Sequence, residues 1–374
     1  MRVLNVNHTI DPVTGGGTAE KTFQMSRQLI LNGIECSILT MATSGSAERR
    51  LENGTIYAIH SLSRRFPFPR CTLGKIKQIV AEHDVIHLMG HWTILNALVY
   101  LAVRKLKRPY VFCPAGALPI FGRSIVLKKI YNLVIGTKIA QNADRCIAIT
   151  EAEIIQFAEY GVRLENIVVI PNAVNEADFV VSDVAEFRKK YGFANRQIIL
   201  FFGRLNLIKG PDLLLRAFFQ IHEAYPEYDL VFAGPDDGML AQLEASVVSN
   251  GAEKKVHFLG YLGGVDKSSA FHAARILVIP SRQEAMSIVV LEAGICGTPA
   301  LFTDQCGLDS MAEAGCGWVA PATAEGIKKG MECALSDEIG ETGSRARSYV
   351  FTHFSWSAVI GKYKMLYENL LKSR

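Results

Sequence analysis

The stretch RILVIPSRQEAMSIVVLEAGICGTPALF, residues 275 to 302, carries the clearest structural pattern in this chain. Its apolar run at 275–279 predicts a buried strand, the residues at 287–296 predict a helix, and a second apolar run at 299–302 predicts another strand. A strand, a helix and a strand in this order form a crossover between parallel strands. The pattern therefore predicts an α/β protein with helices on both faces of parallel sheets.

The same alternation extends through the rest of the chain. In the second half we predict strands at 197–202, 228–233 and 255–259, and helices at 210–224, 238–249 and 266–272. In the first half we predict strands at 3–8, 36–41, 54–59, 84–89, 109–113, 145–150 and 166–170, and helices at 19–33, 72–82, 93–107, 123–142 and 151–160. The glycines at 15–17 predict a turn between the first strand and the first helix.

The chain is predicted to form two domains, because 374 residues exceed what a single hydrophobic core ordinarily organises. The strand and helix pattern restarts after residues 171–174, so we expect an N-terminal domain at 1–170 and a C-terminal domain at 171–355. The last segment, about 356–374, has the apolar spacing of a long amphipathic helix.

Two acidic and two basic residues suggest a ligand site in the second half. Glu284 and Glu292 are eight positions apart, or about 12 Å along a helix, which is too far for both to act on one glycosidic bond. Arg204 and Lys209 in GRLNLIKG can hold a diphosphate, and the carboxylates can accept hydrogen bonds from hydroxyl groups on either side of it. These residue types fit a nucleotide-sugar. Alternatively, Glu284 favours a helix N-terminus and Glu292 is a solvated helix residue.

Several segments resemble glycosyltransferase family 4, the retaining enzymes of GT-B architecture. In the second half they are GRLNLIKGPDLLLRAF (203–218), FAGPDDG (232–238), VHFLGYL (256–262) and PSRQEAMSIVVLEAGICGTPALFTDQCGL (280–308). In the first half they are VIHLMGHW (85–92), VIPNAV (169–174) and the glycine-rich loop. The resemblance implies two facing Rossmann-like domains with a cleft between them. It also implies a C-terminal helix that crosses back to the first domain, with Trp356 anchoring the crossing.

The resemblance also implies roles for individual residues. Arg204 and Lys209 are expected to stabilise the leaving diphosphate, and Glu284 to contact the donor sugar as the third catalytic residue. Glu292 is expected to accept hydrogen bonds from the ribose hydroxyls. The other residues expected around the donor are Gly16, Gly17, Gly203, Tyr261, Leu262, Met286, Ser287 and Ile288, with backbone N–H groups near Ser287 and Ile288 facing the diphosphate.

Two positions depart from the family pattern in the first half. The segment PAG places Ala115 where relatives often have a histidine that contacts the donor sugar, and Met89 replaces a second histidine. His87 or His91 can compensate, or each can be a structural hydrogen-bonding group. Two further interpretations therefore stay open: a non-hydrolysing nucleotide-sugar epimerase, and a protein that binds a nucleotide-sugar with little turnover.

Several functional classes are disfavoured. The eight cysteines are scattered without metal-ligand spacing, and the acids of GPDDG, Asp236 and Asp237, are interpreted as turn residues, so no metal and no cofactor are expected. The glycine run is not followed by the third glycine of a dinucleotide fingerprint, because Glu20 occupies that position. We expect no nucleic-acid partner. With no apolar run of about 18 residues and no signal-peptide pattern, a cytoplasmic location is expected.

Charge is distributed unevenly between the halves. Residues 1–170 contain 20 Lys or Arg and 12 Asp or Glu, whereas residues 171–374 contain 20 and 24. Cations interleave with apolar residues at 63–70, 103–109 and 122–138, as on a surface that contacts anionic lipid. The sequence thus suggests a glycan or a lipid-linked acceptor and peripheral contact with the inner face of a membrane; a solvated basic face is the alternative.

Overall fold

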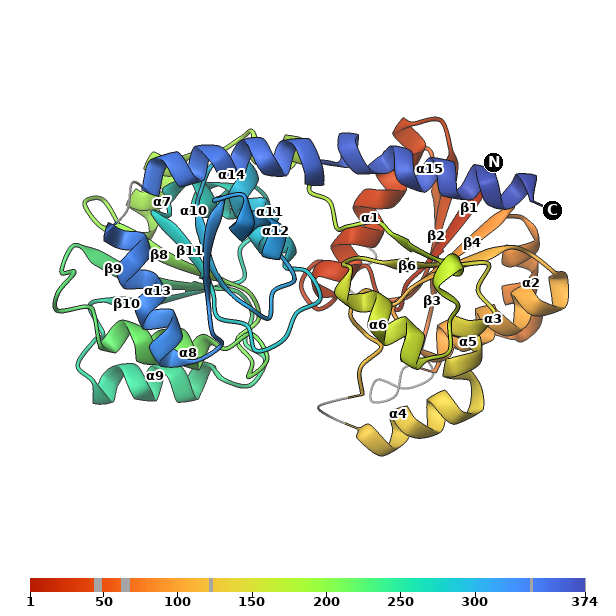
Figure 1. Cartoon of the computed structure of the whole chain (residues 1–374), viewed down its shortest axis with the longest axis horizontal. Helices are drawn as coiled ribbons and strands as arrows, with labels where there is room; N and C mark the ends of the chain where they lie inside the picture. The colour runs from red at the N-terminus through yellow and green to blue at the C-terminus, as the bar shows by residue number, and fades with distance from the viewer. Residues whose placement is uncertain (44–48, 62–67, 121–123, 337–338, 374) are drawn as a thin grey trace. The chain divides into compact units, whose positions relative to one another are not determined.

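The fold consists of two compact α/β units in a computed structural model that describes residues 1–43, 49–61, 68–120, 124–336 and 339–373 (Figure 1). Unit 1 contains Met1–Asn172 and Val359–Arg374, and unit 2 contains Ala173–Ala358. Both sheets are parallel throughout, which confirms the predicted fold class. The cleft expected between two facing domains stays a prediction.

Unit 1 forms, within its described residues, a seven-stranded sheet in the order β3-β2-β1-β4-β5-β6-β7. The strands are β1 (Arg2–Val6), β2 (Glu35–Met41), β3 (Thr55–Ile59), β4 (Val85–Met89), β5 (Tyr110–Cys113), β6 (Arg145–Ala148) and β7 (Ile167–Val169). The central strands are buried, and Val3 pairs with Val85 where β1 meets β4. The strand order reverses at this pair, and ligands of open α/β sheets bind beyond the carboxyl ends of strands at such a point.

Helices connect these strands, and the C-terminal helix completes the unit. They are α1 (Gly16–Leu31), α2 (Leu73–Ala81), α3 (Ile94–Leu106), α4 (Ile125–Tyr131), α5 (Thr137–Gln141), α6 (Ala152–Glu159) and α15 (Trp356–Lys372). Tyr363 and Tyr367 of α15 are fully buried in unit 1, so the predicted return of the terminal helix is confirmed. Trp356, at the start of α15, is buried within unit 2.

Two local predictions in unit 1 need correction. The continuous helix expected at 123–142 is α4 and α5 separated by a π-helix at Asn132–Gly136, and residue 123 lies outside the described residues. A Cβ at Gly136 would lie 2.4 Å from the Asn132 side chain, so a glycine is needed for the tight packing of this wider turn. The glycine run also does more than form a turn, because Gly16 and Gly17 already belong to α1.

Unit 2 forms a six-stranded sheet over its described residues, in the order β10-β9-β8-β11-β12-β13. The strands are β8 (Gln197–Phe202), β9 (Tyr228–Ala233), β10 (Val256–Gly260), β11 (Ile276–Ile279), β12 (Ala300–Thr303) and β13 (Gly317–Ala320). The helices are α7 (Val184–Tyr191), α8 (Pro211–Phe219), α9 (Leu240–Ser249), α10 (Gly264–Ala273), α11 (Ile288–Ile295), α12 (Asp309–Glu313), α13 (Ala324–Ser336) and α14 (Ile339–Phe354).

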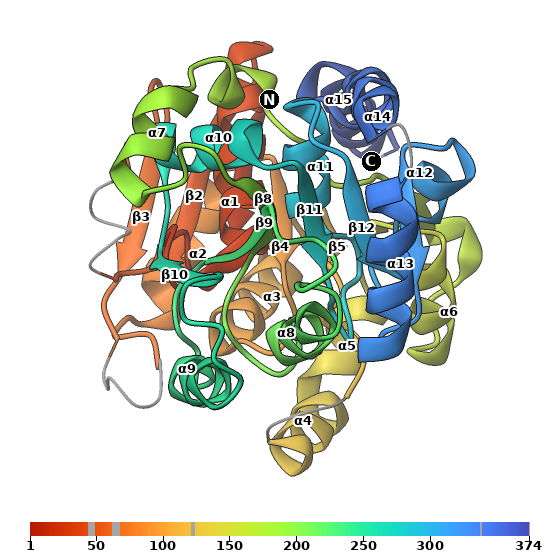
Figure 2. The same ribbon diagram turned by 90° about the vertical axis from the view of Figure 1, so that its left-hand side faces the viewer.

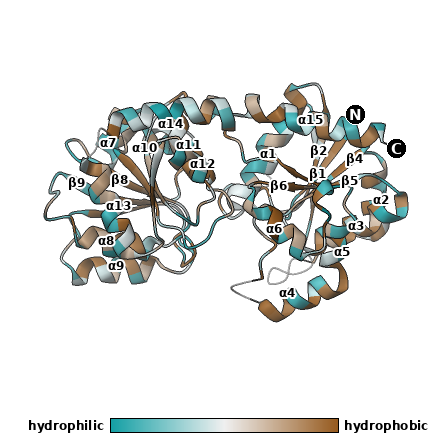
Figure 3. Cartoon of the chain, viewed as in Figure 1, coloured by the Kyte–Doolittle hydropathy of each residue, from teal (hydrophilic) through white to brown (hydrophobic). Residues whose placement is uncertain are grey.

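The helices of unit 2 cover both faces of its sheet, with α10 and α11 on one side and α8 and α9 on the other (Figures 1 and 2). The strands are markedly hydrophobic, as expected for a sheet buried on two faces (Figure 3). Elements α7, α12, β13, α13 and α14 were not predicted from the sequence. No helix among the described residues is both long and apolar enough to cross a bilayer.

Candidate active site

The loop after β8 makes a close contact with the loop after β9. The Gly203 N–H donates to Ala233 O at 2.9 Å, and a Cβ at Gly234 would lie 2.0 Å from Gly203 O. No side chain fits there, so a glycine at position 234 lets the two strand ends touch. This contact brings the basic segment 203–210 beside the Asp236–Asp237 loop.

Lys209 and Glu284 form an ion pair beyond the ends of β8 and β11. Lys209 Nζ contacts Glu284 Oε1, and Ser281 Oγ donates to the same carboxylate oxygen at 2.9 Å. The Glu284 N–H donates to Gln305 O at 2.9 Å, which fixes the loop that carries the carboxylate. The carboxylate is largely buried while the lysine stays partly exposed, so the lysine can still reach a ligand. The structure thus brings together two of the three predicted catalytic residues.

Arg204, the third of these residues, pairs with a different acid. Its Nη1 lies 3.2 Å from Asp237 Oδ2. Asn206 connects the two ion pairs: its amide nitrogen donates to Asp237 Oδ2 at 2.8 Å, and its Oδ1 accepts the Lys209 N–H at 3.0 Å. Arg204 and Lys209 therefore belong to one polar network, although the structure gives no direct contact between them.

The two acids of GPDDG have different roles. Asp236 Oδ1 accepts the N–H groups of Gly238, Met239 and Leu240, which confirms its interpretation as a turn residue. These backbone hydrogen bonds, led by those from Leu240 and Gly238, lower the pKa of Asp236. Asp237 is more than a turn residue, because it holds Arg204 and Asn206. Nothing in the sequence distinguishes the role of Asp236 from that of Asp237.

Glu292 is buried in α11, so the alternative interpretation as a solvated helix residue is wrong. Its Oε1 lies 2.6 Å from Nζ of Lys267, a residue of α10. The same ammonium lies 5.5 Å from the ring centroid of Phe202 and 5.7 Å from that of Phe179. Sequence reasoning missed Lys267, because a lone lysine in GVDKSS carries no motif.

At the start of α11, the backbone N–H of Ser287 does not point where expected from the sequence. The Ser287 N–H, expected to face a diphosphate, donates to Cys306 O at 3.1 Å, because the loop after β12 folds over it. The buried Ser287 Oγ makes no hydrogen bond to any described residue. A buried hydroxyl without a hydrogen-bond partner is energetically costly. At the start of α11 the Ser287 hydroxyl therefore has the capacity to form a hydrogen bond with a ligand. Met286 beside it is buried and Ile288 is half-buried.

The remaining donor-site predictions lie in two places. Tyr261 and Leu262 follow β10, where the tyrosine is exposed and the leucine is buried. In unit 1, Gly16 and Gly17 open α1 just after a loop held by Asp11, whose Oδ1 accepts the N–H groups of Val13 and Thr14 at 2.9 and 3.0 Å. Neither observation tests the role expected for these residues.

His87 and His91 are structural rather than exposed groups. His87 Nδ1 lies 2.7 Å from the Tyr367 hydroxyl, and His91 Nε2 lies 2.9 Å from Asn132 Oδ1. Burial, together with the charge of Lys21, lowers the pKa of His87 to about 3, and burial lowers that of His91 to about 4. Both rings are therefore neutral near pH 7, and among the described residues His87 Nε2 and His91 Nδ1 have no hydrogen-bond partner.

The loop at Ala115 adopts an unusual backbone conformation, with φ of 49° at the alanine. Glu153 is buried below it and accepts the N–H groups of Gly116 and Ile149. Lys21 of α1 is also buried, and its Nζ lies 3.8 Å from Cys113 Sγ. Burial alone would lower the pKa of Lys21, but the interactions with Cys113, Tyr363 and Glu153 are larger together, so the pKa is raised. This buried cation was missed, because the sequence places Lys21 in an ordinary amphipathic helix.

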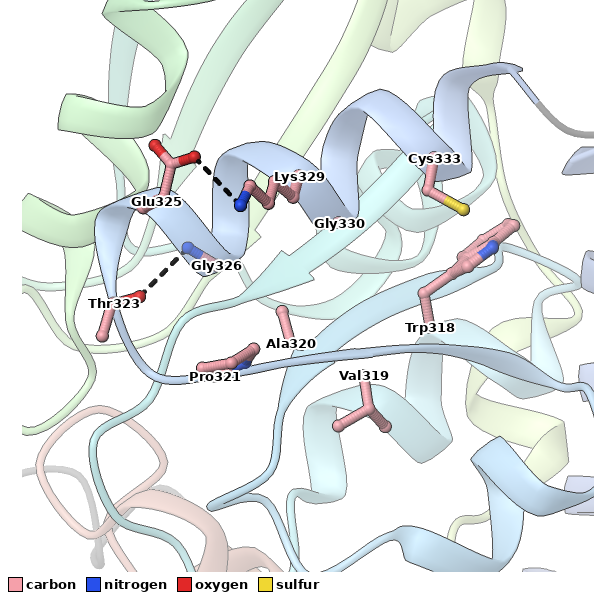
Figure 4. A pocket seen from close by; sticks show the side chains of 10 residues that line it. All are labelled: Trp318, Val319, Ala320, Pro321, Thr323, Glu325, Gly326, Lys329, Gly330 and Cys333. Atoms are coloured by element: carbon pink, nitrogen blue, oxygen red, sulfur yellow. Dashed lines mark hydrogen bonds and ion pairs between the residues drawn. The ribbon is translucent and has the colours of Figure 1, made fainter.

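A separate cavity of about 460 Å³ lies between β13 and α13 (Figure 4). It is lined by Trp318, Val319, Ala320, Pro321, Thr323, Glu325, Gly326, Lys329, Gly330 and Cys333. None of these residues belongs to the predicted donor site. Nor do the described residues contain a cluster of three or more His, Cys, Asp or Glu side chains arranged to hold a metal ion.

Two family models match this chain. "Glycosyl transferases group 1" matches residues 183–350, and "Glycosyltransferase Family 4" matches residues 15–178. Together they cover most of both units, and the chain belongs to the family 4 glycosyltransferases.

Individual relatives agree with this assignment. A D-inositol 3-phosphate glycosyltransferase of Actinosynnema mirum is 28% identical over 331 residues, which cover 78% of this chain and 76% of the relative. A mannosylfructose-phosphate synthase of Agrobacterium fabrum is 33% identical over 181 residues, 46% of this chain and 40% of the relative.

Solved structures share the fold. HepE from Anabaena, in complex with UDP and glucose, superimposes with a TM-score of 0.84 at 19% identity, covering 99% of this chain and 100% of HepE. Sucrose-phosphate synthase from Thermosynechococcus elongatus superimposes with a TM-score of 0.81 at 20% identity, covering both chains completely. The likeness identifies the GT-B fold.

Proposed function

We propose that this protein transfers a sugar from a nucleoside diphosphate sugar to a hydroxyl group of a glycan or lipid-linked acceptor, with retention of the anomeric configuration. The observation that carries the proposal is the polar network of unit 2, in which Lys209 contacts Glu284 and is connected through Asn206 to Asp237 and Arg204. Glu292 adds a buried carboxylate on α11, which forms an ion pair with Lys267 of the helix α10. Family membership agrees with this assignment.

The chemistry follows from the charges that develop during transfer. When the bond between the anomeric carbon and the diphosphate breaks, the electron pair goes to the phosphate oxygen and the sugar becomes electron-poor. Lys209 and Arg204 would stabilise the departing diphosphate, and Glu284 would hold the donor-sugar hydroxyls or offset the positive charge on the sugar. Glu292 would accept hydrogen bonds from the ribose hydroxyls.

Two cations of one network can neutralise the phosphates, so we propose a reaction without a metal ion or other cofactor. UDP is the preferred nucleotide, since the similarly folded HepE has been solved with UDP and with UDP-glucose. The structure shows no disulfide among the described cysteines, which suits a reducing compartment, and we place the reaction in the cytoplasm, in the assembly of surface polysaccharide or glycolipid.

One observation favours a second candidate, a nucleotide-sugar-binding protein with little turnover. Ala115 stands where a donor-contacting histidine is expected, and His87 and His91 are buried, with one ring nitrogen of each hydrogen-bonded to Tyr367 and Asn132 respectively. An assay of UDP-sugars with and without glycan and lipid-linked acceptors separates the candidates. UDP release that depends on an acceptor supports the transferase, whereas binding without release supports the second candidate. Interconversion of the sugar would instead identify an epimerase and contradict both.

A further inference from the structure

An apolar stripe on unit 1 is exposed on α4 and the π-helix that follows it. Its members are Ile125, Val126, Leu127, Ile130, Leu133 and Val134, whose exposed fractions lie between 44% and 84%. Within α4, all of which the structure describes, no side chain is buried. Single exposed apolar residues are common on protein surfaces, but a contiguous group of this kind marks a contact surface.

The spacing of these residues places most of them on one face. Val126, Leu127, Ile130, Leu133 and Val134 stand at positions i, i+1, i+4, i+7 and i+8, a pattern that forms a single stripe along a helix. The segment projects from the rest of unit 1 in two perpendicular views, and its hydrophobic character is visible on the ribbon (Figures 1, 2 and 3).

The other side of the segment is tied to unit 1. The Tyr131 hydroxyl donates to Thr93 O at 3.1 Å, and Asn132 contacts both His91 Nε2 at 2.9 Å and the Tyr160 hydroxyl at 2.6 Å. Because these polar contacts hold the opposite face, the apolar stripe is presented outward by a fixed element. The stripe is therefore available to a partner without any local rearrangement.

The charges beside the stripe are all positive. Residues 124–143 contain Lys128, Lys129 and Lys138 and no Asp or Glu. Lys129 and Lys138 are exposed, and Lys128 Nζ lies 5.5 Å from the Trp92 ring centroid. Apolar side chains flanked by lysines on a helix fit the boundary between the head groups and acyl chains of an anionic bilayer.

We propose that α4 and the π-helix form a docking surface for an anionic lipid bilayer, with the stripe inserted between head groups and the lysines on the lipid phosphates. A second copy of the chain is a poorer partner, since a symmetric contact would place these lysines against each other on a unit of positive charge. The proposal rests on unit 1 alone and goes beyond the proposed transfer reaction, which uses residues of unit 2.

Vesicle flotation of the full chain tests this proposal. We expect binding to phosphatidylcholine vesicles that contain phosphatidylglycerol, and little binding to phosphatidylcholine alone. The triple variant Leu127→Gln, Ile130→Gln, Leu133→Gln should lose at least ten-fold in partitioning, and Lys129→Gln and Lys138→Gln about five-fold each at low salt. The matched control is Leu31→Gln, Val248→Gln, Met365→Gln, whose side chains are similarly exposed on other helices and whose binding should equal wild type.

A second readout guards against misfolded variants. The Leu133→Trp variant should show extra fluorescence quenching by brominated anionic lipid relative to unbrominated lipid, and thermal unfolding of all variants should match wild type because the substituted side chains are exposed. Wild type that fails to float with anionic vesicles, or a triple variant that floats as well as wild type, would overturn the proposal. So would a concentration-dependent dimer in sedimentation velocity that the triple variant abolishes. In all of these outcomes, UDP-sugar turnover with a water-soluble acceptor should stay at the wild-type level. Failure of the membrane-docking proposal can therefore be distinguished from failure of the proposed transfer reaction.

Discussion

Lys267 Nζ lies 2.6 Å from Glu292 Oε1, so the carboxylate proposed to bind ribose is positioned by a cation from a neighbouring helix. The exposed fractions of the two side chains are 24% and 7%, and the lysine also lies beside the rings of Phe179 and Phe202. A buried carboxylate needs a compensating charge, and Lys267 supplies that charge to Glu292.

Substitution of Lys267 should affect donor binding more than turnover. In Lys267→Met the stem is kept but the ammonium is lost, so Glu292 is held less firmly, and we expect the donor KM to rise about ten-fold, or about 1.4 kcal/mol. The kcat should change little. The conservative variant Lys267→Arg, which keeps the positive charge, should have the donor KM of the wild type. Lys328→Met, at an ion pair of similar lysine exposure on α13, is the control. An equal fall of kcat in Lys267→Met would argue against a positioning role.

The two cations of the network should differ in their importance for catalysis. Lys209 contacts the predicted catalytic carboxylate, whereas Arg204 is more exposed and shares its charge with Asp237. We expect Lys209→Ala to lower kcat by about 100-fold and Arg204→Ala by less, since each removes a group that stabilises developing negative charge. Steady-state kinetics at saturating donor measure this. Turnover of Lys209→Ala equal to wild type would remove Lys209 from the mechanism.

Stability should fall in acid because of the buried histidines. Burial and the charge of Lys21 lower the pKa of His87 to about 3, while the unfolded chain titrates near 6.5. Between these values the unfolded state binds a proton that the folded state refuses, so the free energy of unfolding decreases as pH falls, by about 1.4 kcal/mol per pH unit for this group.

The comparison of variants isolates this contribution. The shift of the urea midpoint between pH 7 and pH 5 should be smaller in His87→Gln than in wild type. It should be unchanged in His60→Gln, because His60 lies on the surface. A midpoint shift in His87→Gln as large as that of wild type would show that the buried ring is not a source of the acid sensitivity.

The reaction should need no divalent metal. Lys209 and Arg204 supply the positive charge that a metal would otherwise bring to the diphosphate, so turnover after treatment with EDTA and removal of the chelate should equal that of untreated enzyme. Loss of turnover that magnesium or manganese restores would contradict this prediction.

The regular parts of the fold were predictable, because buried parallel strands give continuous apolar runs such as 197–202 and 275–279. The elements between residue 303 and the C-terminal helix were missed; β13 (Gly317–Ala320) lies at the edge of the sheet with only its last residue buried, and gives a weaker signal. The break of α4 into a π-helix was also missed, since it depends on the packing around Gly136.

The site could be predicted where a motif carries charge, as at Lys209 and Glu284, but partners from other elements could not. Lys267 reaches Glu292 from a helix 25 positions earlier, and Asp237 meets Arg204 across two strand ends. Such pairs are set by the three-dimensional packing of α10, α11 and the loops after β8 and β9. Two basic segments expected at a membrane, 63–70 and 122–138, extend into residues outside the described part of the chain.

Calorimetric titration of the full chain with UDP tests most directly whether unit 2 binds a nucleotide through Glu292 and Lys209. We predict one binding event per chain for wild type, at least ten-fold weaker in Glu292→Ala because two ribose hydrogen bonds to a charged group are lost. Binding should be unchanged in Glu325→Ala, a control on α13. A wild type that binds no nucleoside diphosphate, or a Glu292→Ala variant that binds UDP as tightly as wild type, would contradict the account.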